Sequence, residues 1–235
     1  MRYAAGENTP GDERLRELEP TEVHASLRWL SAANPAVFGA DQHRFRLNPP
    51  LPEEEVSSFE RKHRVRLPAD YRDFVAAVGN GGAGPYYGVF PLGKMDGASG
   101  QLESWQEDNG FIGTLSEPFP LRESWNDLTG MPSQELGHDN EQEYWNRLEG
   151  FEKKYWASSR MNGAIPICHE GCALRVWLVV SGSEAGRLWH DGRADYTGLR
   201  PVLLKNGTPA TFASWYREWL YAALDYVSAS SSSAQ

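Results

Sequence analysis

The chain has 235 residues, of which 40% are hydrophobic and 23% are charged, and its formal net charge is −9. This length suits one well-packed domain or two small ones. A net negative field repels phosphate backbones, which argues against nucleic acid as a direct partner. The sequence has no apolar run long enough to cross a membrane and no apolar secretory leader, and its two cysteines are too few for a disulfide scaffold. We therefore expect an acidic cytoplasmic protein.

The negative charge is concentrated in residues 96–152. This segment has thirteen acidic residues and two basic ones, Arg122 and Arg147, whereas the rest of the chain is slightly positive. Such a concentration is typical of a solvated, loop-rich surface, or of an acidic face that speeds association with a basic partner. The sequence leaves both interpretations open.

Apolar spacing, prolines and glycines predict helices along most of the chain. The expected helices cover residues 21–33, 52–63, 68–78, 139–155 and 211–227. Aromatic and β-branched runs predict a strand with interruptions at 85–92 and strands at 164–167, 174–180 and 187–189, with a hairpin loop over 181–186. Residues 96–140 lack periodicity and predict short strands and loops.

Strands clustered away from helices indicate an α+β fold. We expect a single domain with a largely antiparallel or mixed sheet flanked by helices. An N-terminal extension with one helix covers 1–44, the domain covers 45–227 with an acidic insertion at 96–152, and a disordered serine-rich tail covers 228–235.

Two local motifs resemble ligand sites but lack the required context. Residues Gly79 to Gly84 match the dinucleotide pattern GxGxxG, yet they follow a predicted helix and precede a predicted strand, the reverse of the order that presents a helix N-terminus to a pyrophosphate. They predict a helix stop and a turn, which can also serve as a contact surface. Cys168, His169 and Cys172 form half of a zinc site with no second ligand pair at a matching spacing. We therefore expect no cofactor and no metal.

The sequence also lacks the common catalytic signatures. It has no nucleophile elbow, no zinc-protease helix motif and no phosphate-binding lysine motif. A reactive cysteine paired with His190 is a weak alternative. We expect a protein that is not an enzyme.

Nine tryptophans are a high number, and interfaces draw their hot spots largely from Trp, Tyr and Arg. Trp189 lies at the end of a predicted strand, where partial exposure is expected. With the nearby Asp191, and with Tyr86 and Tyr87 beyond the glycine loop, it forms our candidate contact set. Core packing is the alternative for each of these aromatic residues.

Three blocks of sequence, taken in chain order, resemble a known protein family. They are Leu51 to Phe74 (including LPEEEV and LPADYRDF), Gly79 to Gly88 (GNGGAGPYYG) and Asn162 to Trp189 (including NGAIPICHEGC and WLVVSG), followed by a helix with Trp215 and Trp219. Together they resemble the SUKH superfamily of Smi/Knr-like proteins over residues 45–227. The resemblance implies a single α+β domain in which the glycine loop and the cysteine turn are fold signatures.

The resemblance also implies a function. Bacterial members are mostly immunity proteins that bind and neutralise a toxin domain, often a nuclease, and fungal members are hubs in cell-wall signalling. We expect an immunity protein with a basic cognate toxin as partner; a regulatory adaptor of the Smi/Knr type and a small-ligand binder near the glycine loop are the alternatives. The expected partner contacts are Glu103, Glu107, Asp108, Glu141, Glu143, Tyr86, Tyr87, Trp189 and Asp191.

Overall fold

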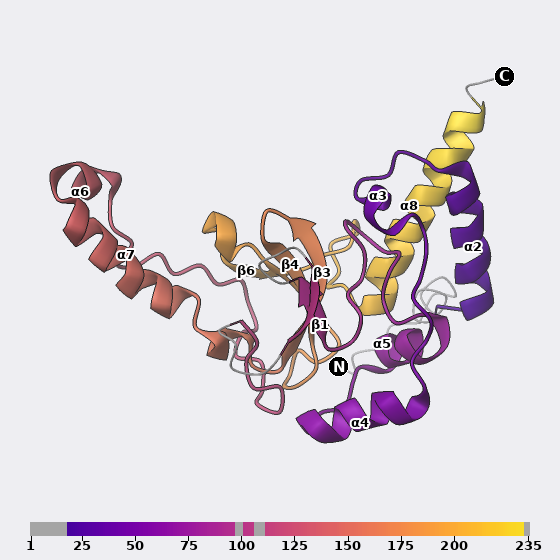
Figure 1. Cartoon of the computed structure of the whole chain (residues 1–235), viewed down its shortest axis with the longest axis horizontal. Coiled ribbons are helices and arrows are strands. Elements are labelled where there is room, and N and C mark those ends of the chain that lie inside the picture. Colours follow the sequence, from indigo (N-terminus) through magenta and orange to yellow (C-terminus); the bar gives the residue numbers. More distant parts are fainter. Residues whose placement is uncertain (1–17, 97–100, 106–110, 233–235) are drawn as a thin grey trace, which may run out of the picture.

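A four-stranded antiparallel sheet, in the order β3-β4-β5-β6, lies at the centre of the structure (Figure 1). The computed structural model describes residues 18–96, 101–105 and 111–232. The strands of this sheet are β3 (Ala164–Gly171), β4 (Leu174–Val179), β5 (Leu188–Asp191) and β6 (Leu199–Pro201). A separate antiparallel hairpin pairs β1 (Lys94–Asp96) with β2 (Leu102–Ser104). The predicted α+β class and antiparallel sheet are confirmed.

Helices flank the sheet, with α2 and α8 packed together on one side of the molecule and α6 and α7 on the other (Figure 1). They include every helix predicted from the sequence. The helices described are α2 (Pro20–Ala33), α3 (Ala40–His43), α4 (Glu53–His63), α5 (Ala69–Asp73), α6 (Gln134–Asp139), α7 (Glu141–Tyr155) and α8 (Phe212–Ser232), with a π-helical turn η1 (Phe74–Val78) and 3-10 turns η2 (Ser158–Met161) and η3 (Arg193–Asp195).

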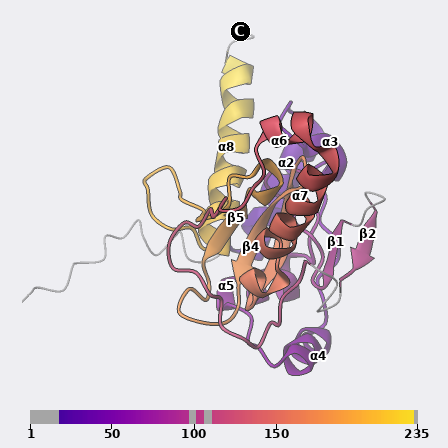
Figure 2. The ribbon, with the colours of Figure 1, turned by 90° about the vertical axis from the view of Figure 1, so that its left-hand side faces the viewer.

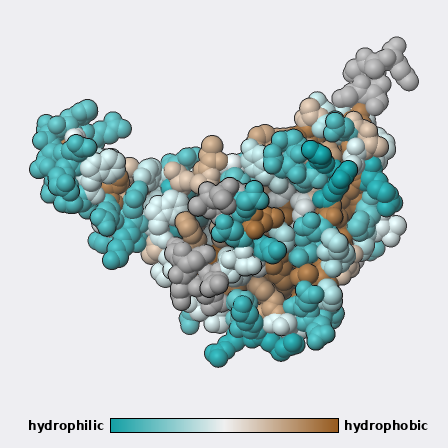
Figure 3. Space-filling view, in the orientation of Figure 1, coloured by the Kyte–Doolittle hydropathy of each residue, from teal (hydrophilic) through white to brown (hydrophobic). Residues whose placement is uncertain are grey.

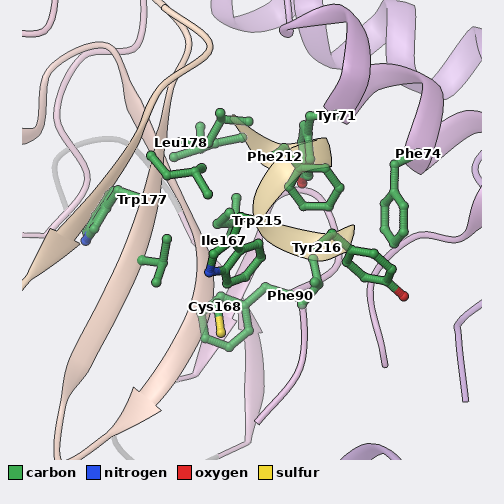
Figure 4. Close-up of a cluster of buried hydrophobic side chains, with 14 of the residues drawn as sticks. Tyr71, Phe74, Phe90, Ile167, Cys168, Trp177, Leu178, Phe212, Trp215 and Tyr216 are labelled. Carbon is green, nitrogen blue, oxygen red and sulfur yellow. The ribbon is translucent and has the colours of Figure 1, made fainter. Parts of the chain in front are cut away.

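Aromatic side chains at the start of α8 form much of the core. The Phe212 ring lies against Tyr71 and Phe74, with its centroid 4.9 Å from each of theirs. Tyr216 Oη donates to the Ala83 carbonyl at 3.0 Å, which ties α8 to the glycine loop. Figure 4 shows these rings packed together beside the sheet. Since burying one large apolar side chain contributes roughly 1.5–3 kcal/mol, this cluster is a main source of stability.

Irregular backbone covers both edges of the four-stranded sheet. At the β3 edge, the Phe90 N–H donates to the Ile167 carbonyl at 2.8 Å. At the β6 edge, Trp125 and Leu199 exchange two backbone hydrogen bonds of 2.8 and 2.7 Å. These bonds occupy edge groups that would otherwise be open to pairing with another chain.

The N-terminal helix belongs to the same core. α2 buries Val23, Leu27 and Leu30, which share one face of the helix, and it packs against α8. The helix ends at Asn34, whose left-handed conformation lets its N–H bond the Leu30 carbonyl at 2.8 Å. Residues 20–33 are therefore a packed part of the fold.

Residues 85–92, predicted as a strand with interruptions, form isolated bridges and no continuous strand. Tyr86 and Gly88 have φ angles of +52° and +98°, so the chain turns at both. What remains of the extended pairing is a pair of isolated bridges at Val89. The aromatic run predicted a strand because its side chains favour strands, but its glycine and its turns break the ladder.

Several element ends differ from those predicted. β3 continues to Gly171, so the turn falls on Cys172 and Ala173, which both have positive φ angles. α8 continues to Ser232, where a disordered tail from residue 228 was expected. The sequence did not predict α3, α6 or β6, because elements this short show little periodicity.

Trp189 is a core residue, so the predicted partial exposure is wrong. Its side chain is 0% exposed. It faces Trp177 across the β4–β5 register, and its ring centroid lies 4.9 Å from that of Phe119. β5 is an inner strand covered by β6, so a partner docked on this fold cannot contact Trp189.

We expect Trp189→Ala to lower the free energy of unfolding by about 3–5 kcal/mol, because truncation of a buried tryptophan leaves a cavity. Trp145→Ala is the matched control: its side chain is 54% exposed, and the change should be within about 0.5 kcal/mol. Urea unfolding of both variants measures the difference. Equal effects of the two substitutions would contradict the core assignment.

Candidate interaction surface

The acidic segment includes a projecting pair of helices, α6 and α7, which we call the acidic arm. Both stand away from the sheet in Figure 1, point toward the viewer in Figure 2, and have a mainly hydrophilic surface in Figure 3. The side chains of Ser133 and Asn140 each accept a backbone N–H at the start of their helix, at 3.4 and 3.1 Å. The two helices touch where the Tyr144 ring lies against Gly137.

Aromatic rings at the end of α7 attach the arm to the sheet. Phe151 and Tyr155 are buried, and the Tyr155 centroid lies 5.2 Å from that of Trp125 and 5.9 Å from that of Tyr196. Tyr155 Oη also donates to Asn126 Oδ1 at 2.8 Å. Trp125 is the residue that bridges β6, so one residue both covers the sheet edge and holds the arm.

Asp191 lies in the interior beside this base, and the prediction that it contacts a partner is wrong. It is 5% exposed. Its carboxylate accepts from Nε and Nη2 of the buried Arg193 at 2.9 and 2.7 Å. That guanidinium lies over the Trp156 ring, 4.7 Å from the centroid. A buried bidentate pair fixes η3 and leaves no carboxylate free for a partner.

Glu141 and Glu143, both predicted as partner contacts, lie on α7 in different settings. Glu143 forms an i,i+4 ion pair with Arg147 at 2.7 Å, so its charge is compensated. Glu141 is exposed and accepts from Trp145 Nε1 at 3.4 Å. The sequence analysis did not select Trp145 as a contact residue. The available signal was its spacing of four residues from Glu141, which places both side chains on the same side of a helix.

The other predicted carboxylates lie elsewhere. Glu103 is exposed on β2, where it pairs with Met95 of β1. Glu107 and Asp108 lie outside the described residues. Among the predicted carboxylates that the structure describes, Glu103 thus lies on β2, apart from Glu141 and Glu143 on α7.

Tyr86 and Tyr87 lie near the β3 edge, away from the arm, and pack against Phe38. The Phe38 centroid is 6.4 Å from that of Tyr86 and 5.3 Å from that of Tyr87, and Phe38 is 62% exposed. A Cβ at Gly39 would overlap the Tyr86 carbonyl, so this approach requires glycine. Burial, and then the charge of Glu170, raise the pKa of Tyr86, which keeps the phenol neutral. We call Phe38, Tyr86 and Tyr87 the aromatic patch; Phe38 left no signal in the sequence.

A cavity of about 620 Å³ lies next to the aromatic patch. Its lining residues include Arg46, Tyr87, Val89, Asp96, His169 and Cys172. Cys168 and Cys172 are both free thiols, and burial raises the pKa of Cys168, so this thiol is a weak nucleophile. Within residues 18–96, 101–105 and 111–232, no group of three or more His, Cys, Asp or Glu side chains is placed to hold a metal ion.

His43 forms part of the inner wall of this cavity, where we expect it to stay neutral near physiological pH. Its ring packs edge-on against Phe45 and Trp219, and burial lowers its pKa from 6.5 to about 4. The folded state thus binds this proton more weakly than the unfolded state does. Its contribution to the free energy of unfolding is present above pH 6.5 and is lost as the pH falls through 4.

NMR titration of the His43 ring measures this pKa directly, and a midpoint near 6.5 would contradict the burial argument. His43→Asn keeps an acceptor for the Phe45 N–H, which His43 Nδ1 binds at 3.0 Å. This variant should therefore weaken the dependence of urea stability on pH between about 7 and 4. Replacing the exposed His138 with Asn controls for the loss of an imidazole elsewhere.

In the described part of the chain, none of the helices has the length and apolar character that crossing a membrane requires. No curated protein and no solved structure matches the chain. The model of the SMI1 / KNR4 family (SUKH-1) matches residues 50–195, which include the glycine loop, the acidic arm and the sheet through β5, whereas α2 and α8 lie outside the match. The chain therefore belongs to the SMI1 / KNR4 family (SUKH-1), as the three sequence blocks predicted.

Proposed function

We propose that this protein is a non-enzymatic, cytoplasmic immunity protein that binds and neutralises a basic toxin domain. The observation that carries the proposal is the acidic arm, which presents carboxylates and an exposed tryptophan clear of the folded body. Family membership supports a binding role rather than a catalytic one, since the resemblance implies no catalytic motif.

Electrostatics explains why such an arm suits a basic partner. A nuclease needs a positively charged cleft to hold phosphates, and a narrow acidic helix pair can occupy that cleft in their place. Complementary fields raise association rates by roughly 10–10³, and salt screens them over about 8 Å at physiological ionic strength. Because the arm projects, its carboxylates can approach a concave surface within that distance.

The attachment of the arm adds to this argument. Phe151 and Tyr155 are buried at its base, and Tyr155 is hydrogen-bonded to Asn126 at 2.8 Å. A surface held in its binding geometry loses less entropy on association than a mobile one. Because its base is buried, the arm is already folded before a partner binds, which favours tight binding.

A regulatory adaptor is the second candidate. The aromatic patch on the β3 side is separated by the sheet from the acidic arm on the β6 side (Figure 1). Two separate surfaces suit a protein that joins two partners. Unlike an immunity protein, an adaptor would not need a toxin gene next to its own gene.

Co-expression with the C-terminal domain of the neighbouring large reading frame tests the immunity proposal. We expect relief of toxicity and a complex that survives purification, with an association rate that falls steeply as salt rises. A triple variant of the arm, Glu135→Gln, Glu141→Gln and Glu149→Gln, should bind more slowly and lose part of its salt dependence.

The matched control removes three exposed carboxylates from other helices, with Glu54→Gln, Glu55→Gln and Asp225→Asn. It has the same net charge as the arm variant and should bind nearly as fast as the wild type. Failure of the wild-type protein to relieve toxicity or form a complex would refute the immunity proposal for that pair. Equal slowing by both triple variants would show that net charge matters and that the arm does not.

A further inference from the structure

One side of α7 carries an exposed line of residues, Glu141, Trp145 and Glu149, at a spacing of four. An α-helix turns about 100° per residue, so these three side chains lie within roughly 80° of its circumference. All three are exposed. We call this line the tryptophan ridge.

The opposite flank of the same helix is different. Glu143 and Arg147 lie roughly 200–240° around the helix from Glu141, and they neutralise each other in an ion pair of 2.7 Å. The Glu149 carboxylate, in contrast, has no hydrogen bond or ion pair to any residue within the described part of the chain. Glu141 and Glu149, the two carboxylates of the ridge, therefore have no ion pair within the described residues, unlike Glu143.

The Trp145 ring is held in place although it is exposed. Its Nε1 donates to Glu141 Oε1 at 3.4 Å. Its ring meets that of Tyr144 edge-on, at a centroid distance of 5.3 Å and an interplanar angle of 82°. A tryptophan that is already oriented loses little rotamer freedom on binding, and tryptophan is among the residues most enriched at interface hot spots.

We propose that the tryptophan ridge is the contact surface of the arm, and that its partner is a protein with an apolar recess bordered by Lys and Arg. Trp145 fills the recess, while Glu141 and Glu149 pair with the cations at its border. This inference rests on the proposed function for the basic character of the partner. It goes further in assigning binding to one flank of α7 and in naming an aromatic anchor, not charge alone, as the main source of affinity.

Affinity measurements with the cognate toxin domain test the ridge. We expect Trp145→Ala to weaken binding by at least about 30-fold, the loss typical of an interface hot spot. Trp29→Ala is its control, because Trp29 is also exposed, at 45%, but lies on α2; it should change the affinity by less than about twofold. Urea unfolding of both variants checks that neither alters the fold.

Substitutions of charged residues on α7 give a second test variant with a matched control on the same helix. Glu149→Gln should lower the association rate several-fold and reduce its salt dependence. The double change Glu143→Gln with Arg147→Gln removes a pair that is already neutral and keeps the net charge, so it should leave both nearly unchanged. If the wild type binds and protects but Trp145→Ala binds as tightly, the ridge is refuted and the immunity proposal stands. If the wild type neither binds nor protects, both proposals fail.

Discussion

The need to cover two open edges of a four-stranded sheet shapes the rest of this structure. An edge strand presents unpaired N–H and C=O groups, which must be paired or protected. Here the cover comes from irregular segments distant in sequence, with Phe90 bonded to Ile167 at one edge and Trp125 bonded to Leu199 at the other. Each covering segment also builds a surface. The first places two tyrosines of the aromatic patch against Phe38, and the second leads into the acidic arm.

At the β6 edge, the residue that covers the sheet also supports the acidic arm. The Trp125 backbone pairs with Leu199, while its ring packs on Tyr155 and lies under the Arg160 guanidinium, 3.8 Å from its centroid. Next to it, Asp191 and Arg193 form a buried pair. Breaking such a pair leaves an uncompensated buried charge, which is strongly destabilising. The arm is thus attached through groups that cannot be removed without damage to the sheet.

Local patterns predicted the elements well, but not the side chains that reach the surface. The β-branched and aromatic run of residues 174–180 and the glycine stop after Val78 are local signals, and the structure has a strand at Leu174–Val179 and a helical turn that ends at Val78. Trp189 looked exposed because its strand ends soon after it, yet β6 follows and pairs Trp189 with Pro201. The position of Trp125 depends on a bridge to β6, which is distant in sequence and leaves no local trace. The pairing of Asp191 with Arg193, two residues apart, was a local signal that the prediction overlooked.

The charges at the ends of α7 suit a stable helix, since Glu141 and Glu143 lie in its first turn and Lys153 and Lys154 in its last, but the exposed Trp145 has no such role. Ion pairs at i,i+4 stabilise a helix by a few tenths of a kcal/mol each, and the chain uses one at Glu143 and Arg147. A basic residue at position 145 could form such an ion pair with Glu141 or Glu149, each four residues away. That position holds an exposed tryptophan instead. Exposed apolar surface framed by carboxylates adds little to the stability of the free protein, and it gains a physical role once a partner covers the ring and supplies the cations.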